Sequence, residues 1–229
     1  MILAVMSGFM LSCSPDCIQG IGDSKTENRN PSAFNGVKLE IPAKLVVEQS
    51  LTQEFSISGQ PNILANITAE VNDGMLTIKS KECFSDCKEV LILVKVPELS
   101  KLLINGSGSI KTNGKLKGDH LEFGINGSGT IEAEADAVSV YGGIKGSGSV
   151  IIKGTAKQQY VKLTGSGTYE ASELATVESD LNLSGSGSMK VFVLEKLNAK
   201  VIGSGEILYK GSPKTAINVE GSGKVSKVD

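Results

Sequence analysis

Few residues of this chain combine a reactive type with a spacing that suits catalysis. A serine nucleophile needs a nearby histidine, and the chain has only His120. Glycoside hydrolysis needs two carboxylates that face each other, whereas the acidic residues between Asp119 and Asp180 fall at different repeat positions, as on a solvated charged face. A calcium-binding repeat would need an aspartate in every short repeat. We therefore expect no catalytic residue, no metal site, no cofactor and no enzymatic activity.

The four cysteines are the other candidates for chemistry. Cys83 and Cys87 enclose three residues, and a loop this short can be closed by a disulfide. Four zinc ligands are hard to assemble, because the domain offers no second cysteine pair and one histidine. We therefore predict a Cys83–Cys87 disulfide, which would form outside the cytoplasm. Cys17 is left free, or pairs with Cys13 if Cys13 is not modified.

Seven serines recur between two glycines and indicate the architecture. The Gly-Ser-Gly triplets begin at Gly106, Gly127, Gly146, Gly165, Gly185, Gly203 and Gly221. Spacings of 18 to 21 residues with one constant corner motif are typical of the stacked coils of a β-solenoid. A serine that is repeated seven times is explained by this geometry before any catalytic role is considered.

Apolar residues alternate with polar ones on both sides of each triplet. The column two residues before it reads Ile104, Ile125, Ile144, Leu163, Leu183, Val201 and Val219, and the column two residues after it reads Ile110, Ile131, Val150, Tyr169, Met189, Ile207 and Val225. This period of two predicts half-buried strands. Continued through the triplet, it predicts that both glycines face inward and the serine outward. Glycine would suit a narrow interior or a bend with positive φ.

The outward residues that could bind a ligand are the triplet serines and two tyrosines. Tyr141 and Tyr160 share one outward position in adjacent coils, so we expect their rings to stack and to suit a sugar ring or a protein partner. The serine stripe, a hydroxyl array, includes Ser107, Ser128, Ser147, Ser166 and Ser186. Each feature also has a structural explanation, because corner packing requires a small residue and an aromatic ladder shields backbone.

Composition fits one all-β domain with a thin core. The chain is 40% hydrophobic and holds 27 glycines and no tryptophan, which suits stacked aliphatic columns. A formal net charge of −2 and a single arginine, Arg29, leave no basic patch for nucleic acid. Residues 34–100 alternate without triplets and are expected to be irregular opening coils that cap residues 101–229, with both parts in one domain, 34–229.

The N-terminus predicts export. Residues 1–12 are apolar and too short to span a bilayer, as in the hydrophobic part of a signal peptide. Met10-Leu11-Ser12-Cys13 resembles a lipobox, although the leucine lies two rather than three residues before the cysteine and no basic residue precedes the apolar run. We expect a lipidated Cys13 and a flexible tether over residues 13–33. An ordinary cleaved signal is the alternative.

The repeated block resembles a known family. Asn105 to Ile110, Asn126 to Ile131, the string Gly124-Ile125-Asn126 and the lead-in Val94 to Leu99 resemble the putative autotransporter adhesins with a head GIN domain. This family is also described as a domain of unknown function common in Bacteroidetes lipoproteins. The resemblance covers residues 34–229 and implies a right-handed β-helix-like solenoid, exported from a Gram-negative cell, with no catalytic motif.

The resemblance and the predicted export together suggest a function. We expect an outer-membrane lipoprotein, on the periplasmic or the outer face, that acts as a non-catalytic adhesin or binding scaffold for a glycan or a protein. The alternative is a structural or sensory envelope lipoprotein with no external ligand. The oligomeric state is left open.

Overall fold

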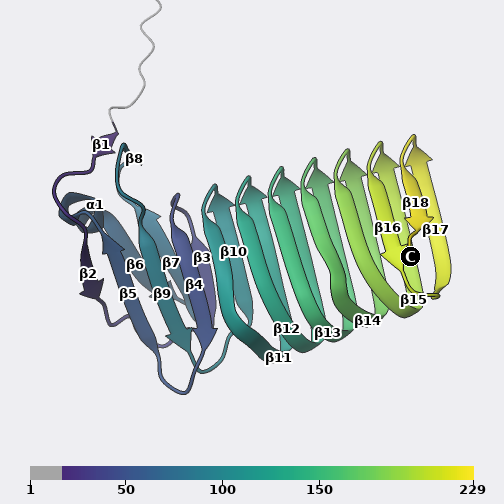
Figure 1. Ribbon diagram of the computed structural model, residues 1–229, viewed down its shortest axis with the longest axis horizontal. Helices are drawn as coiled ribbons and strands as arrows, with labels where there is room; N and C mark the ends of the chain where they lie inside the picture. The colour runs from purple at the N-terminus through teal and green to yellow at the C-terminus, as the bar shows by residue number, and fades with distance from the viewer. Residues whose placement is uncertain (1–16) are drawn as a thin grey trace, which may run out of the picture.

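Parallel strands stack along the long axis of the molecule, in a computed structural model that describes residues 17–229 (Figure 1). Each coil runs along one face, turns at the Gly-Ser-Gly corner, returns along a second face and bends again at a second corner. We call the stretch that leads into a triplet the A face and the stretch that follows it the B face. The predicted signal segment and Cys13 lie outside the described residues.

The regular coils begin at residue 101. Their strands are β10 (Lys101–Gly106), β11 (Ser109–Gly127), β12 (Thr130–Gly146), β13 (Ser149–Gly165), β14 (Thr168–Gly185), β15 (Ser188–Gly203), β16 (Glu206–Lys210), β17 (Lys214–Gly221) and β18 (Lys224–Lys227). All neighbours pair in parallel, and the first glycine of every triplet is in register with that of the next coil. The predicted all-β solenoid with aligned corners is therefore confirmed.

An irregular cap closes the N-terminal end, at the left of Figure 1. Its elements are β1 (Ile18–Gln19), β2 (Lys25–Asn28), β3 (Gly36–Leu39), β4 (Lys44–Gln49), β5 (Glu54–Gly59), α1 (Pro61–Asn66), β6 (Ile67–Asn72), β7 (Met75–Ser80), β8 (Phe84–Ser85) and β9 (Leu91–Val96). The strands β3 and β4 stack on β10 and β11, and β7 and β9 stack beyond them. Antiparallel strands form the N-terminal edge of both faces. On the A face β6 pairs with β7, and on the B face β5 pairs with β9 and β2 with β5.

The predicted apolar columns form the core. Both columns are buried from the first triplet to the sixth. In the last described coil Val219 is 37% exposed and Ile217 is 45% exposed, because that coil has a neighbour on one side only. Burial of these ladders, at about 25 cal/mol per Å² of apolar surface, is the main term that stabilises the stack.

The two glycines of a triplet have different roles. The prediction that both face inward is right for the second and wrong for the first. Gly148 is buried, and a Cβ there would lie 2.6 Å from Ile125 Cγ2. Gly146 has a φ of +123° and is partly exposed, and a Cβ there would lie 2.4 Å from the Gly127 carbonyl oxygen. The positive φ interrupts the pleat of the strand, so the alternation of inward and outward residues does not continue through this residue. The triplet serines lie outward as predicted and are exposed.

A second irregular glycine makes room for a buried tyrosine. Gly142 interrupts an apolar column of the A face, and a Cβ there would lie 2.6 Å from Tyr169 Cε2. The hydroxyl of Tyr169 accepts a hydrogen bond of 2.9 Å from Gln159 Nε2, and Ser179 Oγ donates to Gln159 Oε1 at 3.1 Å. Burial raises the pKa of Tyr169. This polar chain lies inside the solenoid with its groups satisfied.

Coil length varies only at the second corner. The register slips between Lys111 and Lys115, between Ile151 and Lys153, and between Ala171 and Glu178, whereas pairing through the triplets is continuous. The extra residues of β11 and β14 fall at these slips. The Gly-Ser-Gly corner therefore keeps one geometry while the second corner absorbs insertions.

The predicted Cys83–Cys87 disulfide is wrong. Cys17 is bonded to Cys83, with 4.8 Å between their Cα atoms. Cys87 has no disulfide partner among residues 17–229 and is partly buried against the core. The reason is the short parallel ladder of β1 and β8, in which Ile18 pairs with Phe84 and so places the preceding cysteines side by side. The bond ties the start of the described chain to the cap.

Candidate functional site

Two exposed tyrosines stack on the A face. Tyr141 of β12 and Tyr160 of β13 are in register, with ring centroids 5.2 Å apart and an interplanar angle of 16°. The residues are 41% and 39% exposed, so the predicted stack is confirmed and remains accessible. The ring of His120, on β11, lies 6.3 Å from that of Tyr141 at an angle of 54° and extends the aromatic surface.

Bare backbone lies beside these rings. Gly143 occupies the next outward position of β12 after Tyr141, and a Cβ built on it would have no heavy atom within 4 Å. Its φ lies outside the left-handed region, so the backbone does not require glycine there. The neighbouring Gly124 differs, because the side chain of Leu103 covers it at 2.7 Å from the Cβ position. The missing side chain at Gly143 therefore leaves an open floor next to the aromatic stack.

The open floor is the centre of a shallow groove. Two hollows, of about 430 and 640 Å³, share Gly143 and Lys162. The first is lined by Glu122, Tyr141, Tyr160, Asp180 and Asn182, and the second by Lys38, Leu103, Asn105, Asn126, Lys145 and Thr164. The groove thus crosses the A face over several coils, with the tyrosines on one side and asparagines and lysines on the other.

The polar side chains of the groove are partly engaged with one another. Asn182 Nδ2 donates to Asp180 Oδ1 at 2.9 Å, and Asn126 Nδ2 donates to Asn105 Oδ1 at 3.2 Å. Carboxylates and amides each have several donor or acceptor positions, so these single contacts leave others available. The groove can therefore offer aromatic faces together with hydrogen-bonding groups, which is the combination that a hydroxyl-rich ring requires.

The serine stripe lies apart from this groove. Ser147 follows Tyr141 by six residues along the same coil, a distance of about 20 Å for an extended strand. The backbone N–H of Ser147 donates to the Gly127 carbonyl at 3.0 Å, and Ser128 and Ser166 donate equivalently to the glycines of their preceding coils. The serines therefore take part in corner stacking, and the structure does not bring them to the tyrosines.

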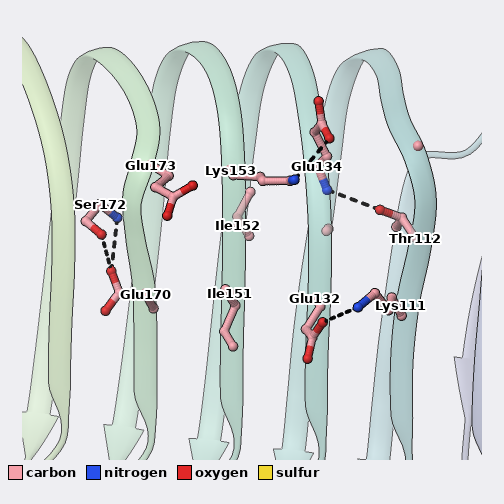
Figure 2. Close-up of a pocket in the computed structure, with 12 residues that line it drawn as sticks. Lys111, Thr112, Glu132, Glu134, Ile151, Ile152, Lys153, Glu170, Ser172 and Glu173 are labelled. Carbon is pink, nitrogen blue, oxygen red and sulfur yellow. Dashed lines mark hydrogen bonds and ion pairs between the residues drawn. The ribbon is translucent and has the colours of Figure 1, made fainter.

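A separate hollow, of about 340 Å³, lies on the B face near the second corner (Figure 2). Residues of β11, β12, β13 and β14 line it, and the register slips between β11 and β12 and between β13 and β14 lie beside it. The expectation that the carboxylates are scattered is wrong here, because Glu132 and Glu170 occupy the same repeat position, before the slips in each coil. Only Glu173 is brought into its row by a slip, the one between Ile151 and Lys153. Glu132 and Glu170 share one row with Lys111, and Glu134 and Glu173 share another with Lys153.

These carboxylates are mostly paired with lysines. Lys111 Nζ lies 3.0 Å from Glu132, and Lys153 Nζ lies 3.4 Å from Glu134 (Figure 2). Burial opposes ionisation of Glu170, yet hydrogen bonds from Ser172 and Lys190 lower its pKa overall. A general acid for glycoside hydrolysis needs a raised pKa, so Glu170 is poorly suited to that role. Among residues 17–229 no three His, Cys, Asp or Glu side chains are grouped to hold a metal ion.

A parallel solenoid with an aromatic groove on an outer face defines a repeat scaffold with a candidate surface site. The chain belongs to the family described as putative auto-transporter adhesin, head GIN domain, whose sequence profile matches residues 33–213. This confirms the resemblance read from the repeated block. An adhesin-type family indicates a protein that is not an enzyme and that lies outside the cell or in its envelope. No curated protein is detectably similar to the chain.

Solved structures share the fold over nearly their whole length. A putative lipid binding protein from Parabacteroides distasonis is 25% identical, with a TM-score of 0.78 over 93% of this chain and 99% of that one. A putative adhesin from Bacteroides fragilis is 24% identical, with a TM-score of 0.85 over 92% and 100% of the two chains. A putative adhesin from Parabacteroides merdae is 22% identical, with a TM-score of 0.74 over 93% and 100%. The last two show the fold alone.

Proposed function

We propose that this protein is a non-catalytic adhesin that binds a carbohydrate in the A-face groove. The observation that carries the proposal is the exposed stack of Tyr141 and Tyr160 beside the open floor at Gly143. Flat aromatic faces suit the apolar faces of sugar rings, and the neighbouring amides and carboxylates suit their hydroxyl groups. Because side chains fill the interior, the outer faces are the surfaces that can meet a ligand.

We further propose that the protein is exported and anchored by lipid at Cys13 to the outer membrane of a Gram-negative cell, after cleavage of residues 1–12. The family and the Cys17–Cys83 disulfide support export, because such bonds persist in oxidising compartments. In residues 17–229 no helix has the length and apolarity to cross a membrane. Metabolic labelling with a palmitate analogue, which Cys13→Ser should abolish, tests the anchor. Protease shaving of intact cells tests which membrane face carries the protein.

A glycan array tests carbohydrate binding. The full chain, solubilised in mild detergent, should bind a subset of saccharides, and the double variant Tyr141→Ala/Tyr160→Ala should lose at least tenfold in affinity. Gly143→Thr should lose binding as well, because its side chain would occupy the floor while the backbone accepts it without strain. The matched control Ser147→Ala/Ser166→Ala changes two exposed residues outside the groove and should bind normally. Saccharide binding that is indifferent to all three groove residues would contradict the assignment.

The alternative function is a structural or sensory envelope lipoprotein with no external ligand. It predicts that no saccharide or surface protein binds and that deletion of the gene leaves cell attachment unchanged. Lipid vesicles belong in the same experiment, because one similar structure is described as a putative lipid binding protein. Vesicle binding without saccharide binding would contradict the assignment of the tyrosines to a saccharide site.

A further inference from the structure

We propose that the groove selects acidic saccharides, whose carboxylate or sulfate group is bound by Lys145 and Lys162. The proposal rests on the carbohydrate-binding function above and names the ligand class. Lys162 is in register with Gly143 on the neighbouring coil, and Lys145 occupies the next outward position after Gly143 on β12. Both side chains are exposed and line the groove.

The first argument is that these two lysines lack the carboxylate partners that three other lysines of the A face have. Lys38 lies 2.7 Å from Glu40, Lys101 lies 2.6 Å from Glu122, and Lys200 lies 2.9 Å from Glu220. Lys145 and Lys162 have no ion pair and no side-chain hydrogen bond in the described part of the chain. Three lysines of the A face, including Lys38 of the groove lining, are therefore paired with carboxylates, whereas Lys145 and Lys162 leave two unpaired positive charges at the floor.

The second argument is the spacing of the two lysine positions around the bare backbone. Neighbouring coils lie about 4.8 Å apart, and successive outward positions of a strand lie about 6.6 Å apart. Lys162 therefore flanks Gly143 across the coils and Lys145 flanks it along the strand. An anionic group above Gly143 would be in reach of both lysines, each of which donates charge-assisted hydrogen bonds.

The third argument is the distribution of charge along the groove. The carboxylates of Glu122 and Asp180 flank the tyrosines in their own row and already accept contacts from Lys101 and Asn182. The opposite side of the floor holds asparagines, Thr164 and Lys145 instead. A ligand with its anionic group toward Lys145 and its neutral hydroxyls toward Asp180 satisfies both sides, and the reverse orientation brings like charges together.

The test compares acidic saccharides with matched neutral forms. The full chain is applied to an array of uronic acid, sialylated, sulfated and neutral oligosaccharides, with methyl esters of the uronic acid members as neutral counterparts. The variants are Lys145→Gln/Lys162→Gln, Tyr141→Ala/Tyr160→Ala, and Lys117→Gln/Lys157→Gln as a control that removes two exposed lysines elsewhere. We expect acidic members to bind at least tenfold more tightly than their esters. We also expect a loss of at least tenfold in the groove variants only, and weaker binding at higher salt.

The outcomes separate the inference from the function on which it rests. If neutral saccharides bind, and if binding is lost in the tyrosine variant but unchanged in Lys145→Gln/Lys162→Gln, the inference is overturned. The proposed carbohydrate function is then still supported. An equal loss in the Lys117/Lys157 control would show unspecific attraction of polyanions and would also overturn it. Binding of no saccharide at all would refute both.

Discussion

The corner glycines allow a stringent test within a single strand. Gly146→Ala should destabilise the protein strongly, whereas Gly143→Ala, three residues earlier in β12, should not. At Gly146 the φ of +123° is one that L residues rarely adopt, and the new Cβ would lie 2.4 Å from the Gly127 carbonyl oxygen. At Gly143 the new Cβ would project into open space, with no atom within 4 Å.

The magnitude follows from what must break at the corner. Backbone strain of this kind costs about 1–3 kcal/mol. Moving the carbonyl away from the Cβ would sacrifice the hydrogen bonds from Ser147 N and Gly148 N to Gly127 O, both 3.0 Å long. At about 1 kcal/mol each, these bring the total to roughly 3–5 kcal/mol. Gly143→Ala should instead gain about 0.4–1 kcal/mol, because alanine restricts the unfolded chain.

Urea unfolding followed by circular dichroism measures the difference. The midpoint should fall sharply for Gly146→Ala and should rise slightly for Gly143→Ala, at similar slopes. The control Ser147→Ala removes an exposed hydroxyl at the same corner and should shift stability by no more than about 0.5 kcal/mol. Equal midpoints for the two alanine variants would refute the explanation of the corner by positive φ and carbonyl stacking.

Three further predictions concern the core, the cap and acid stability. Gly142→Ala should lower stability by about 1–3 kcal/mol, because its Cβ would lie 2.6 Å from the ring of Tyr169. The loss should largely vanish in a Tyr169→Leu background. Thermal unfolding of the wild type, the two single variants and the double variant measures this. Cys17→Ser removes the disulfide to Cys83, which spans a sequence separation of 66. The free energy of unfolding in guanidinium should fall by up to about 4 kcal/mol. A reductant should lower the stability of the wild type and leave that of the variant unchanged. The pKa of Glu170 is lowered from 4.5, so its ionised form stabilises the fold above that pH, and this contribution is lost as the pH falls below it. Glu170→Gln should therefore flatten the dependence of Tm on pH in the acid range. An unchanged slope would contradict the assignment.

The sequence predicts the solenoid well because its signals are local and repeated. A constant corner and a period of two place the same residue types at the same point of each coil, so the aligned glycines follow directly. The stack of Tyr141 on Tyr160 follows for the same reason, since two residues at one repeat position in adjacent coils must be neighbours.

The errors arise where a long-range or conformational fact overrides the pattern. The partner of Cys83 is set by the pairing of β1 with β8, two strands that are each two residues long and leave no periodic signal. The period of two does not predict the direction of the first triplet glycine, because its positive φ interrupts the pleat of the strand. In the B-face hollow Glu173 reaches its row through the register slip between Ile151 and Lys153, which a fixed repeat length does not contain. Glu132 and Glu170 instead share one repeat position that the sequence analysis overlooks.

The alternation alone does not indicate the groove, although the sequence carries a signal for it. The pair Gly142 and Gly143 looks like a simple break in the alternation, yet the two residues point to opposite sides of the strand. Gly142 accommodates Tyr169 inside, whereas Gly143 exposes the floor outside. An outward glycine between two large outward side chains, Tyr141 and Lys145, is the pattern that would have indicated a groove.

The confinement of length changes to one edge of the coil has a consequence for how such scaffolds diversify. Peptide can be added or removed at the second corner while the aligned glycine edge keeps every later coil in step. The shape of the second corner can therefore change without a change in the groove on the A face. A library that randomises residues at the second corner should yield folded proteins with new shapes and an undisturbed A-face groove.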